Sequence, residues 1–272
     1  MYTKEQYERA FELRKEGFTY KEISKKLNVA YPGTIIDWVK RGKIPKGHFL
    51  KSNFNKLSSE LGYIRGVLMG DGYVSIKAKG TKGQIGLEVK DKDFAQTFHN
   101  QLEKWSGLKA QFDFNENKGL YTVQLYSLRA AEFLKEFDIS DLVNANEEIK
   151  VNFLRGMFDS EGNVSGSNLN TPRTSTRFVA LFNTDEELIR LVKVLLEAVG
   201  IKVQNIDKKI GGFTGHTVCF RLRIGSKINL EMFKNKIGFS IARKNKKLED
   251  ILSSYGHNPK SIYYNISPKT VY

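Results

Sequence analysis

Leu61-Gly-Tyr-Ile-Arg-Gly-Val-Leu-Met-Gly-Asp71-Gly72 and Val151-Asn-Phe-Leu-Arg-Gly-Met-Phe-Asp-Ser-Glu161-Gly162 repeat one pattern within a single chain. Each stretch predicts an apolar helix that ends in one carboxylate and a glycine. Small residues recur four positions apart in both stretches: Gly66, Gly70, Gly156 and Ser160. Residues four positions apart share one helix face, so two such helices can pack closely and place Asp71 beside Glu161.

Two unrelated amphipathic helices, each ended by a glycine, are the alternative explanation of these stretches. Their shared order of residue types argues against it, and a second landmark supports a repeat. Gly107-Leu-Lys-Ala-Gln111 matches Gly200-Ile-Lys-Val-Gln204 at nearly the same distance behind each motif. A duplicated α-β-β-α-β-β-α unit explains both observations.

The composition is that of a basic globular protein. The chain has 272 residues, a formal net charge of +14 and a sequence pI near 9.6. A positive field of this kind suits a polyanion, with nucleic acid favoured over a membrane surface. The sequence has no apolar run long enough to cross a membrane and no signal-peptide core, so we expect an intracellular protein in the cytoplasm or an organelle. Its single cysteine, Cys219, excludes internal disulfides and is expected in the core.

The first 45 residues predict a small all-α helix-turn-helix domain. Thr19-Tyr-Lys-Glu22 reads as a capping box and Pro32 suits the first turn of a third helix. In a helix-turn-helix the third helix enters the major groove, although a three-helix protein-interaction domain is the alternative. The side chains expected to face DNA are Tyr31, Thr34, Asp37 and Lys40. Residues 46–56 read as a basic linker.

Strand and helix patterns follow each motif in the same order. They predict one half-domain over residues 57–148, a second over residues 149–255 and an extended tail over residues 256–272. In the second half we expect a helix capped at Thr184 and a strand over residues 203–208.

Each half is expected to cover one face of its sheet with its own helices and to leave the other face open. Alternation along the strands places mostly polar hydrogen-bonding side chains on that open face: Ser75, Lys77, Gln84, Gln111, Gln124, Arg177, Gln204, Arg221 and Arg223. Such donors suit phosphates and base edges. Two such sheets related by a pseudo-dyad would form a basic saddle for duplex DNA, which is itself dyad-related.

These residues resemble the LAGLIDADG homing endonucleases. Ile64-Arg-Gly-Val-Leu-Met-Gly-Asp71-Gly72 and Leu154-Arg-Gly-Met-Phe-Asp-Ser-Glu161-Gly162 align with the family nonapeptide, and the likeness extends over roughly residues 57–252. Two copies in one chain resemble the monomeric, pseudo-symmetric members. The segment Ile237-Gly-Phe-Ser-Ile-Ala-Arg-Lys-Asn-Lys-Lys-Leu248 resembles a frequent closing segment of the family.

The resemblance implies an α+β fold of two αββαββα half-domains whose motif helices pack along a pseudo-dyad. It also implies that the eighth motif position, Asp71 and Glu161, binds a divalent metal beside the DNA minor groove. Met69 replaces the first Asp of the nonapeptide and Glu161 replaces the second. Glu161 keeps the charge and adds a methylene, which leaves the ligand geometry open.

Phosphodiester hydrolysis needs charge neutralisation at the phosphoryl oxygens, an activated water and a stabilised leaving alkoxide, which Mg²⁺ held by carboxylates can supply. Mn²⁺ is expected to replace Mg²⁺, and Ca²⁺ to bind without supporting cleavage. Backbone carbonyls of Gly70 and Ser160 are candidate additional ligands. Lys227 is a candidate for stabilising the phosphate, with a solvated lysine at a helix start as the alternative. The four histidines form no metal-ligand spacing.

The leading hypothesis is a monomeric, Mg²⁺-dependent, site-specific endonuclease that takes part in intron homing and cuts a long, roughly pseudo-palindromic duplex. The alternatives are a cleavage-inactive DNA-binding transcription regulator on the same scaffold and an RNA intron maturase. Retention of both Asp71 and Glu161 favours the nuclease. The ends of the chain lack the nucleophile and terminal Asn that intein splicing needs.

Overall fold

The computed structural model describes Tyr2 and residues 4–43, 54–77, 82–167, 176–211 and 217–256. Most of the predicted linker and nearly all of the predicted tail lie outside these ranges, as do His48, His216 and His257. None of the described helices is long and apolar enough to cross a bilayer.

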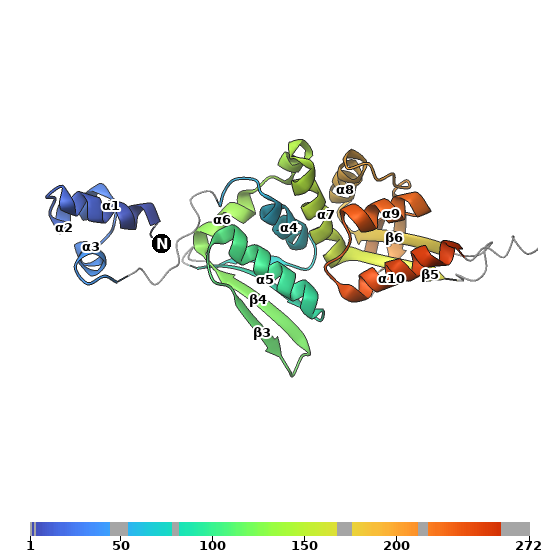
Figure 1. Cartoon of the computed structure of the whole chain (residues 1–272), viewed down its shortest axis with the longest axis horizontal. Coiled ribbons are helices and arrows are strands. Elements are labelled where there is room, and N and C mark those ends of the chain that lie inside the picture. The colour runs from blue at the N-terminus through green and yellow to red at the C-terminus, as the bar shows by residue number, and fades with distance from the viewer. Residues whose placement is uncertain are drawn as a thin grey trace, which may run out of the picture.

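Three helices begin the chain: α1 (Lys4–Lys15), α2 (Tyr20–Lys26) and α3 (Pro32–Val39). The predicted capping box at the start of α2 is confirmed, because the Thr19 side chain accepts from the backbone N of Glu22 and the Glu22 side chain accepts from the backbone N of Thr19. The helices enclose their own apolar cluster of Ala10, Leu13, Ile23, Val29, Ile35 and Trp38. Figure 1 shows them apart from the other elements, beyond α6.

The rest of the chain is built from two copies of one unit. The first contains α4 (Ser59–Leu68), β1 (Tyr73–Ile76), β2 (Gly83–Val89), α5 (Lys92–Ser106), β3 (Gln111–Asn115), β4 (Leu120–Tyr126), α6 (Leu128–Glu136) and the 3₁₀ helix η1 (Ile139–Asn144). The second contains α7 (Glu147–Glu161), β5 (Gly162–Ser167), β6 (Thr176–Asn183), α8 (Glu186–Ala198), β7 (Asp207–Gly211), β8 (Thr217–Ile224) and α9 (Lys227–Lys236). Then α10 (Ala242–Ser253) and η2 (Ser254–Gly256) end the described chain.

Both sheets are antiparallel and have the same topology, with strand orders β1-β2-β4-β3 and β5-β6-β8-β7. The edge strands β1 and β5 directly follow the motif helices α4 and α7. The predicted α+β fold of duplicated half-domains is therefore confirmed. One continuous apolar core runs through both halves, because α4 and α7 lie against each other in its middle (Figure 1).

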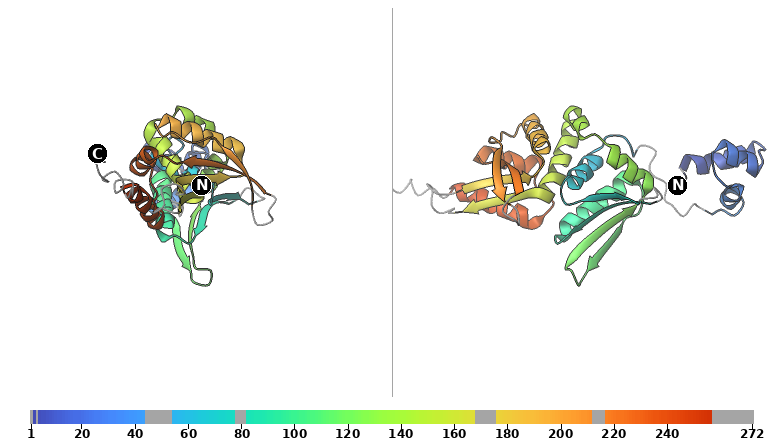
Figure 2. Two further views of the ribbon diagram at one scale, coloured as in Figure 1. Left: turned by 90° about the vertical axis from the view of Figure 1, so that its right-hand side faces the viewer. Right: turned by 180° about the vertical axis from the view of Figure 1, so that it is seen from behind.

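Each sheet has a covered face and an open face. Ile85, Leu87, Val123 and Leu125 are buried against helices of the first half, and Val179, Leu181, Leu222 and Ile224 are buried in the second. Alternation along the strands sends their neighbours to the opposite side. Figure 2, seen from behind, shows the strands in front of α5 in the first half and in front of α9 and α10 in the second.

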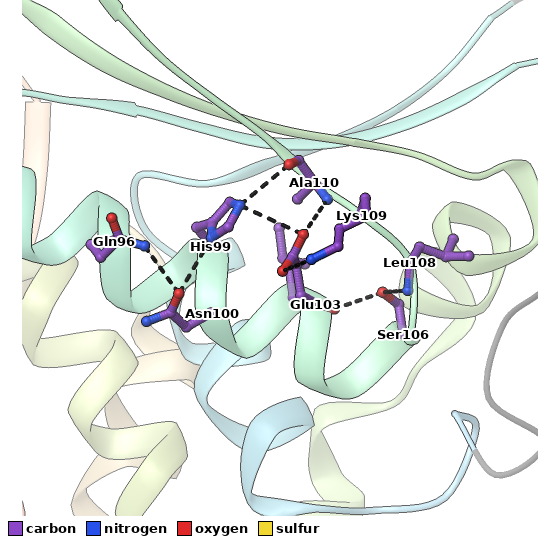
Figure 3. A network of polar contacts seen from close by, with 9 residues as sticks. Gln96, His99, Asn100, Glu103, Ser106, Leu108, Lys109 and Ala110 are labelled. Carbon is purple, nitrogen blue, oxygen red and sulfur yellow. Dashed lines mark hydrogen bonds and ion pairs between the residues drawn. The ribbon is translucent and has the colours of Figure 1, made fainter. Parts of the chain in front are cut away.

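The junction between α5 and β3 explains the sequence landmark behind each motif. Gly107 ends α5 with φ +74° and Gly200 follows α8 with φ +87°, a conformation that glycine adopts most readily. A polar network fixes the first junction (Figure 3). The Glu103 carboxylate accepts from the backbone N of Ala110 at 3.0 Å and from Lys109 Nζ at 3.3 Å. His99 Nε2 lies 3.2 Å from the Ala110 carbonyl, so this histidine has a structural role.

The structure corrects two boundaries in the second half. Asp185, rather than Thr184, caps α8, because its side chain accepts from the backbone N of Leu188. The strand predicted over residues 203–208 begins at Asp207 instead.

An extra residue in the chain before β7 explains the shifted strand. The backbone N of Gln204 donates to the Arg223 carbonyl at 2.9 Å, and Asp207 lies opposite Arg221. Three steps along this segment therefore match two steps along β8, as in a β-bulge.

Candidate active site and nucleic-acid interface

The motif helices α4 and α7 touch backbone to backbone. A Cβ added to Gly66 would lie 2.2 Å from the Phe153 carbonyl oxygen, and one added to Gly156 would lie 2.3 Å from the Tyr63 carbonyl oxygen. Gly62 makes the same kind of approach one turn earlier, at 2.7 Å from the Ile149 carbonyl oxygen. The predicted close packing through small residues is confirmed, and Gly62 extends it by a turn.

This packing brings the C-terminal ends of both motif helices together. A Cβ on Gly70 would lie 2.5 Å from the Ser160 Cβ and 3.1 Å from the Glu161 Cγ. Burial raises the pKa of Glu161, and the neighbouring carboxylate of Asp71 raises it further. Burial also raises the pKa of Asp71. The two acids therefore form one electrostatically coupled pair at the start of β1 and β5.

Such a pair fits a hard divalent cation. Two partly desolvated carboxylates repel each other, and a cation between them would relieve that repulsion. Among the described residues, no third His, Cys, Asp or Glu side chain joins this pair in a cluster that could hold a metal ion. Gly70 and Ser160 lie beside the acids at the two helix ends, where carbonyls have few intrahelical partners.

Asp159 is a buried carboxylate next to this pair. It is 1% exposed, its Oδ2 accepts from the Tyr63 hydroxyl at 2.8 Å, and its Oδ1 accepts from the backbone N of Ser240 at 2.8 Å. Burial raises its pKa to about 6, and the hydrogen bonds from Ser240 and Tyr63 limit the rise. Asp159 thus joins both motif helices to the segment that precedes α10.

Lys244 of α10 is a buried lysine whose charge acts on both acids. It is 8% exposed, and its Nζ donates to the carbonyls of Asp159 at 2.6 Å and Phe158 at 3.1 Å. Burial lowers its pKa to about 8, and its charge in turn opposes the rise in the pKa of both Asp71 and Glu161. Lys244 therefore caps the C-terminus of α7 beside the two acids.

Lys227 does not take this position. It is exposed at the start of α9, and its Nζ lies 3.7 Å from the Glu231 carboxylate one turn along the same helix. Lys227 is therefore a solvated lysine at a helix start, which was the alternative expectation. Lys244 is the basic residue that lies beside the acid pair.

A basic cavity of about 450 Å³ lies beside the end of α7. Its lining combines the start of β5 with one face of α10: Ser160, Gly162, Asn163, Val164, Arg243, Lys244 and Lys247. Both guanidinium Nε and Nη2 of Arg243 donate to the Asp91 carboxylate, at 2.7 and 2.6 Å, so α10 is also tied to the first half. The cavity has the charge expected of a phosphate-binding surface.

The open face of the first sheet is neutral near its middle. Gln84 Nε2 donates to the Tyr73 hydroxyl at 3.0 Å, and the Tyr126 hydroxyl donates to Gln124 Oε1 at 2.7 Å. Gln124 Nε2 also reaches the Tyr73 hydroxyl, at 3.4 Å. Ser75, Lys77 and Gln111 are exposed on the same face. These predicted residues share the open face, where four of the side chains form one network.

The open face of the second sheet carries two arginines. Arg221 and Arg223 lie on it, and Asp207 is ion-paired with both arginines. Gln204 lies opposite Arg223, to whose carbonyl its backbone N donates, and so shares this face. Cys219 lies on the same face, half-buried and opposite Lys209, so the expectation of a core cysteine is wrong.

Arg177 was expected on this open face and lies on the opposite one. It shares a face of β6 with Val179 and Leu181, which are buried on the covered side. Its Nε donates to the Ser254 hydroxyl at 2.8 Å, and its guanidinium lies over the Tyr255 ring. Arg177 therefore connects η2 to the covered face of the second sheet.

In the N-terminal helices, Ile35 and Trp38 are buried, whereas Tyr31 is 73% exposed. Thr34 is partly exposed, and Lys40 is exposed at the C-cap of α3. The Asp37 carboxylate pairs with Arg41 at 2.6 Å and Lys43 at 3.4 Å. This pairing lowers the pKa of Asp37, with the Arg41 hydrogen bond as the main cause, so its charge is already neutralised.

Sequence reasoning missed Asp159, Lys244 and Arg243. The signal was present, since Asp159 stands at the motif position that Met69 fills in the first copy, and Lys244 lies in the recognised closing segment. Contacts more than eighty residues apart in the chain make these residues part of the site, and no local pattern reports such contacts.

Comparison with known proteins agrees with this architecture. The family model described as "LAGLIDADG-like domain" matches residues 58–137 and 148–238. An uncharacterized protein of Methanocaldococcus jannaschii, MJ0398, is 32% identical over 261 residues, covering 89% of this chain and 91% of that protein. A second uncharacterized protein of that organism, MJ0314, is 32% identical over 160 residues, covering 56% of this chain and 58% of its own length.

Among solved structures, a variant of the homing endonuclease I-DmoI superposes with a TM-score of 0.50. The match covers 68% of this chain and 92% of that chain at 16% sequence identity. At this identity the similarity concerns the fold.

Proposed function

The chain belongs to the LAGLIDADG-like domain family, and from this premise we propose that it is a site-specific double-stranded DNA endonuclease that uses a divalent metal ion. One observation carries the proposal above all. Asp71 and Glu161 meet at one end of the closely packed α4–α7 pair, at the point where an edge strand of each sheet begins. A duplex lying across both open faces would pass over this pair.

The proposed roles follow from the positions of the residues. Asp71 and Glu161 hold Mg²⁺ or Mn²⁺, with the carbonyls of Gly70 and Ser160 beside them. The bound metal would neutralise the phosphoryl charge, activate water and stabilise the leaving alkoxide. Lys244 holds the end of α7 in place and offsets part of the negative charge of the acids.

The cavity beside Glu161 is the proposed binding surface for the DNA backbone. Arg243, Lys244 and Lys247 line it, and each adds positive charge within reach of a phosphate. The net charge of +14 adds a longer-range attraction that depends on salt.

The N-terminal helices extend this proposal. We assign residues 1–45 to a helix-turn-helix that lengthens the recognised site, with the exposed N-terminal end of α3, around Tyr31, toward the major groove. Deletion of residues 1–45 should shorten the footprint on DNA. An unchanged footprint would reject this role.

Cleavage of a randomised duplex library tests the central proposal. The full chain, incubated with Mg²⁺, should cut a small set of sequences, and EDTA should abolish cutting. Asp71→Asn and Glu161→Gln should lose cleavage and keep binding, because both substitutions keep the side-chain size. Lys227→Gln is the matched control and should cut normally, since Lys227 contacts only Glu231 among the described charges near it. Binding without cutting by the unmodified chain would reject the nuclease and favour the DNA-binding regulator.

A further inference from the structure

The second open face carries a preorganised pair of arginines. Arg221 and Arg223 are two residues apart on β8, so both side chains project from one face of the sheet. Asp207 lies opposite Arg221, and its Oδ2 accepts from Arg221 Nη2 at 2.7 Å. The same oxygen lies 3.0 Å from Arg223 Nη2. One carboxylate oxygen therefore holds both guanidinium groups.

This arrangement leaves hydrogen-bond donors unused. The Nε atoms of Arg221 and Arg223 are buried and have no hydrogen-bond partner. The side chains are 17% and 30% exposed, so each guanidinium is held against the sheet while part of it still reaches the surface. Arg223 also lies over the Phe178 ring, which further limits its movement. Two ordered guanidinium groups that each keep part of their surface exposed suit a rigid partner with paired acceptors.

The bulge before β7 creates this arrangement. Without the bulge, regular alternation from Gln204 would place Asp207 opposite Phe220, with its side chain on the covered face. With it, Asp207 falls on the open face, in register with Arg221. The bulge thus re-aims one carboxylate to where it can hold both arginines.

The first half has no counterpart of the pair. Its register places Thr122 and Gln124 at the positions of Arg221 and Arg223, and Asp113 at the position of Asp207. No arginine occurs between Arg65 and Arg129, so the whole first sheet lacks one. The two open faces therefore have the same geometry and different hydrogen-bonding chemistry.

Resting on the proposed DNA function, we propose that Arg221 and Arg223 read guanines in the major groove of one half of the target and that Asp207 is their positioning residue. Arginine donates two hydrogen bonds to O6 and N7 of guanine, an acceptor pair that no other base presents there. A carboxylate that orders the guanidinium before binding lowers the entropic cost of the contact. The other half-site is read without arginine, so the target is chemically asymmetric although the fold is pseudo-symmetric.

Selection of randomised duplexes by the full chain, with Ca²⁺ in place of Mg²⁺, tests this proposal. The selected sequences should contain G·C pairs at defined positions in one half only. Arg221→Gln and Arg223→Gln should each remove the preference at one of those pairs and lower the affinity for the selected sequence by about 10- to 100-fold. Asp207→Asn should lower the preference for guanine at both pairs while affinity for unrelated DNA is retained.

Two further variants serve as matched controls. Arg190→Gln removes an exposed arginine on α8 that pairs with Glu186, away from the open face, and should leave the preference intact. Gln124→Arg places an arginine at the equivalent position of the first half and should add a guanine preference to the other half-site.

The outcomes separate this proposal from the endonuclease proposal. A selected sequence whose guanines survive both arginine substitutions overturns the arginine assignment and leaves sequence-specific DNA binding in place. A selected sequence with equal guanine content in both halves overturns the asymmetry in the same way. Failure to select any sequence overturns both proposals together.

Discussion

The second motif closes with Asp159, Ser160 and Glu161 inside α7, whereas the first closes with Met69, Gly70 and Asp71 just beyond the end of α4 at Leu68. Asp159 is buried and binds Tyr63 and the segment before α10, and Lys244 then caps the same helix. Met69 is only partly buried, and its sulfur lies 3.7 Å from Arg65 Nη2. The eighth motif position is acidic in both copies. The sixth position differs between the copies, because the segment before α10 contacts Asp159 of the second copy.

The motif arginines, in contrast, make equivalent contacts in both copies. Arg65 Nη1 donates to the Leu134 carbonyl at 2.6 Å, near the end of α6, and Arg155 Nε donates to the Ile237 carbonyl at 2.5 Å, at the end of α9. Each motif arginine thus satisfies the last carbonyls of the final helix in its own repeat. This part of the repeat serves the fold, and both halves need it equally.

The largest effect should come from the contact that the two motif helices share. Gly66→Ala and Gly156→Ala each place a Cβ within 2.3 Å of a backbone carbonyl oxygen, so each should destabilise the chain by about 3 kcal/mol or more. Gly33→Ala on α3 is the matched control, since nothing lies within 4 Å of its added Cβ. Chemical denaturation measures all three. Near-neutral values for Gly66→Ala or Gly156→Ala would contradict the backbone contact.

Asp159→Ala and Met69→Ala test the difference between the motif copies. Removal of the Asp159 carboxylate leaves the Tyr63 hydroxyl and the Ser240 amide without their buried acceptor and Lys244 without a neighbouring negative charge, which should cost about 2–4 kcal/mol. Met69→Ala should cost about 1 kcal/mol, because it removes only partly buried apolar contacts. Thermal unfolding of the two variants gives the comparison, and equal losses would mean that the copies are equivalent here.

Arg65→Met and Arg155→Met compare the residues that the copies share. Arg65 is 8% exposed, and Arg65→Met should lower the free energy of unfolding by about 2 kcal/mol, since the Leu134 carbonyl loses a charged donor in a buried setting. Arg155 is more exposed, and water can replace it at Ile237, so about 1 kcal/mol is expected. The denaturant midpoints of the two variants measure both losses, provided that the dependence of the unfolding free energy on denaturant concentration is unchanged. A larger loss for Arg155 would reverse this reasoning.

The pH dependence of stability tests the burial of Lys244. Burial lowers its folded pKa to about 8, while the unfolded chain keeps the proton up to about 10.5. Between these values the unfolded state binds more protons, so stability should rise with pH relative to Lys244→Met. We expect a difference of about 3 kcal/mol across this window, because each unit between the folded and unfolded pKa corresponds to about 1.4 kcal/mol. Parallel stability profiles for the two proteins would contradict a buried ammonium.

The fold was largely predictable from the sequence. Gly66 and Gly156 mark the helix contact, and alternation along the chain marks the described strands apart from β7. These signals are local, with periods of two or four residues, and the repeat supplies each of them twice. The contact partners of the second motif could not be read in this way, because Ser240 and Lys244 reach Asp159 only through the folded chain.

Two errors have a common physical cause in strand register. A shift of one residue turns a side chain to the opposite face of a sheet, so Arg177 was placed on the open side and lies on the covered side. The bulge before Asp207 causes the other error, because one extra residue moves the start of β7 beyond the alternation of the sequence. Both faults lie in the second half, which carries the features that the first half lacks.

Strand-resolved cleavage of the selected duplex tests most directly whether the two motif acids form one metal-dependent site. With each strand labelled separately and Mg²⁺ present, the unmodified chain should cut both strands. Asp71→Asn and Glu161→Gln should each slow at least one strand by about 100-fold or more, because each removes a carboxylate from the shared site. Cutting of both strands at the unmodified rate by either variant would contradict the account.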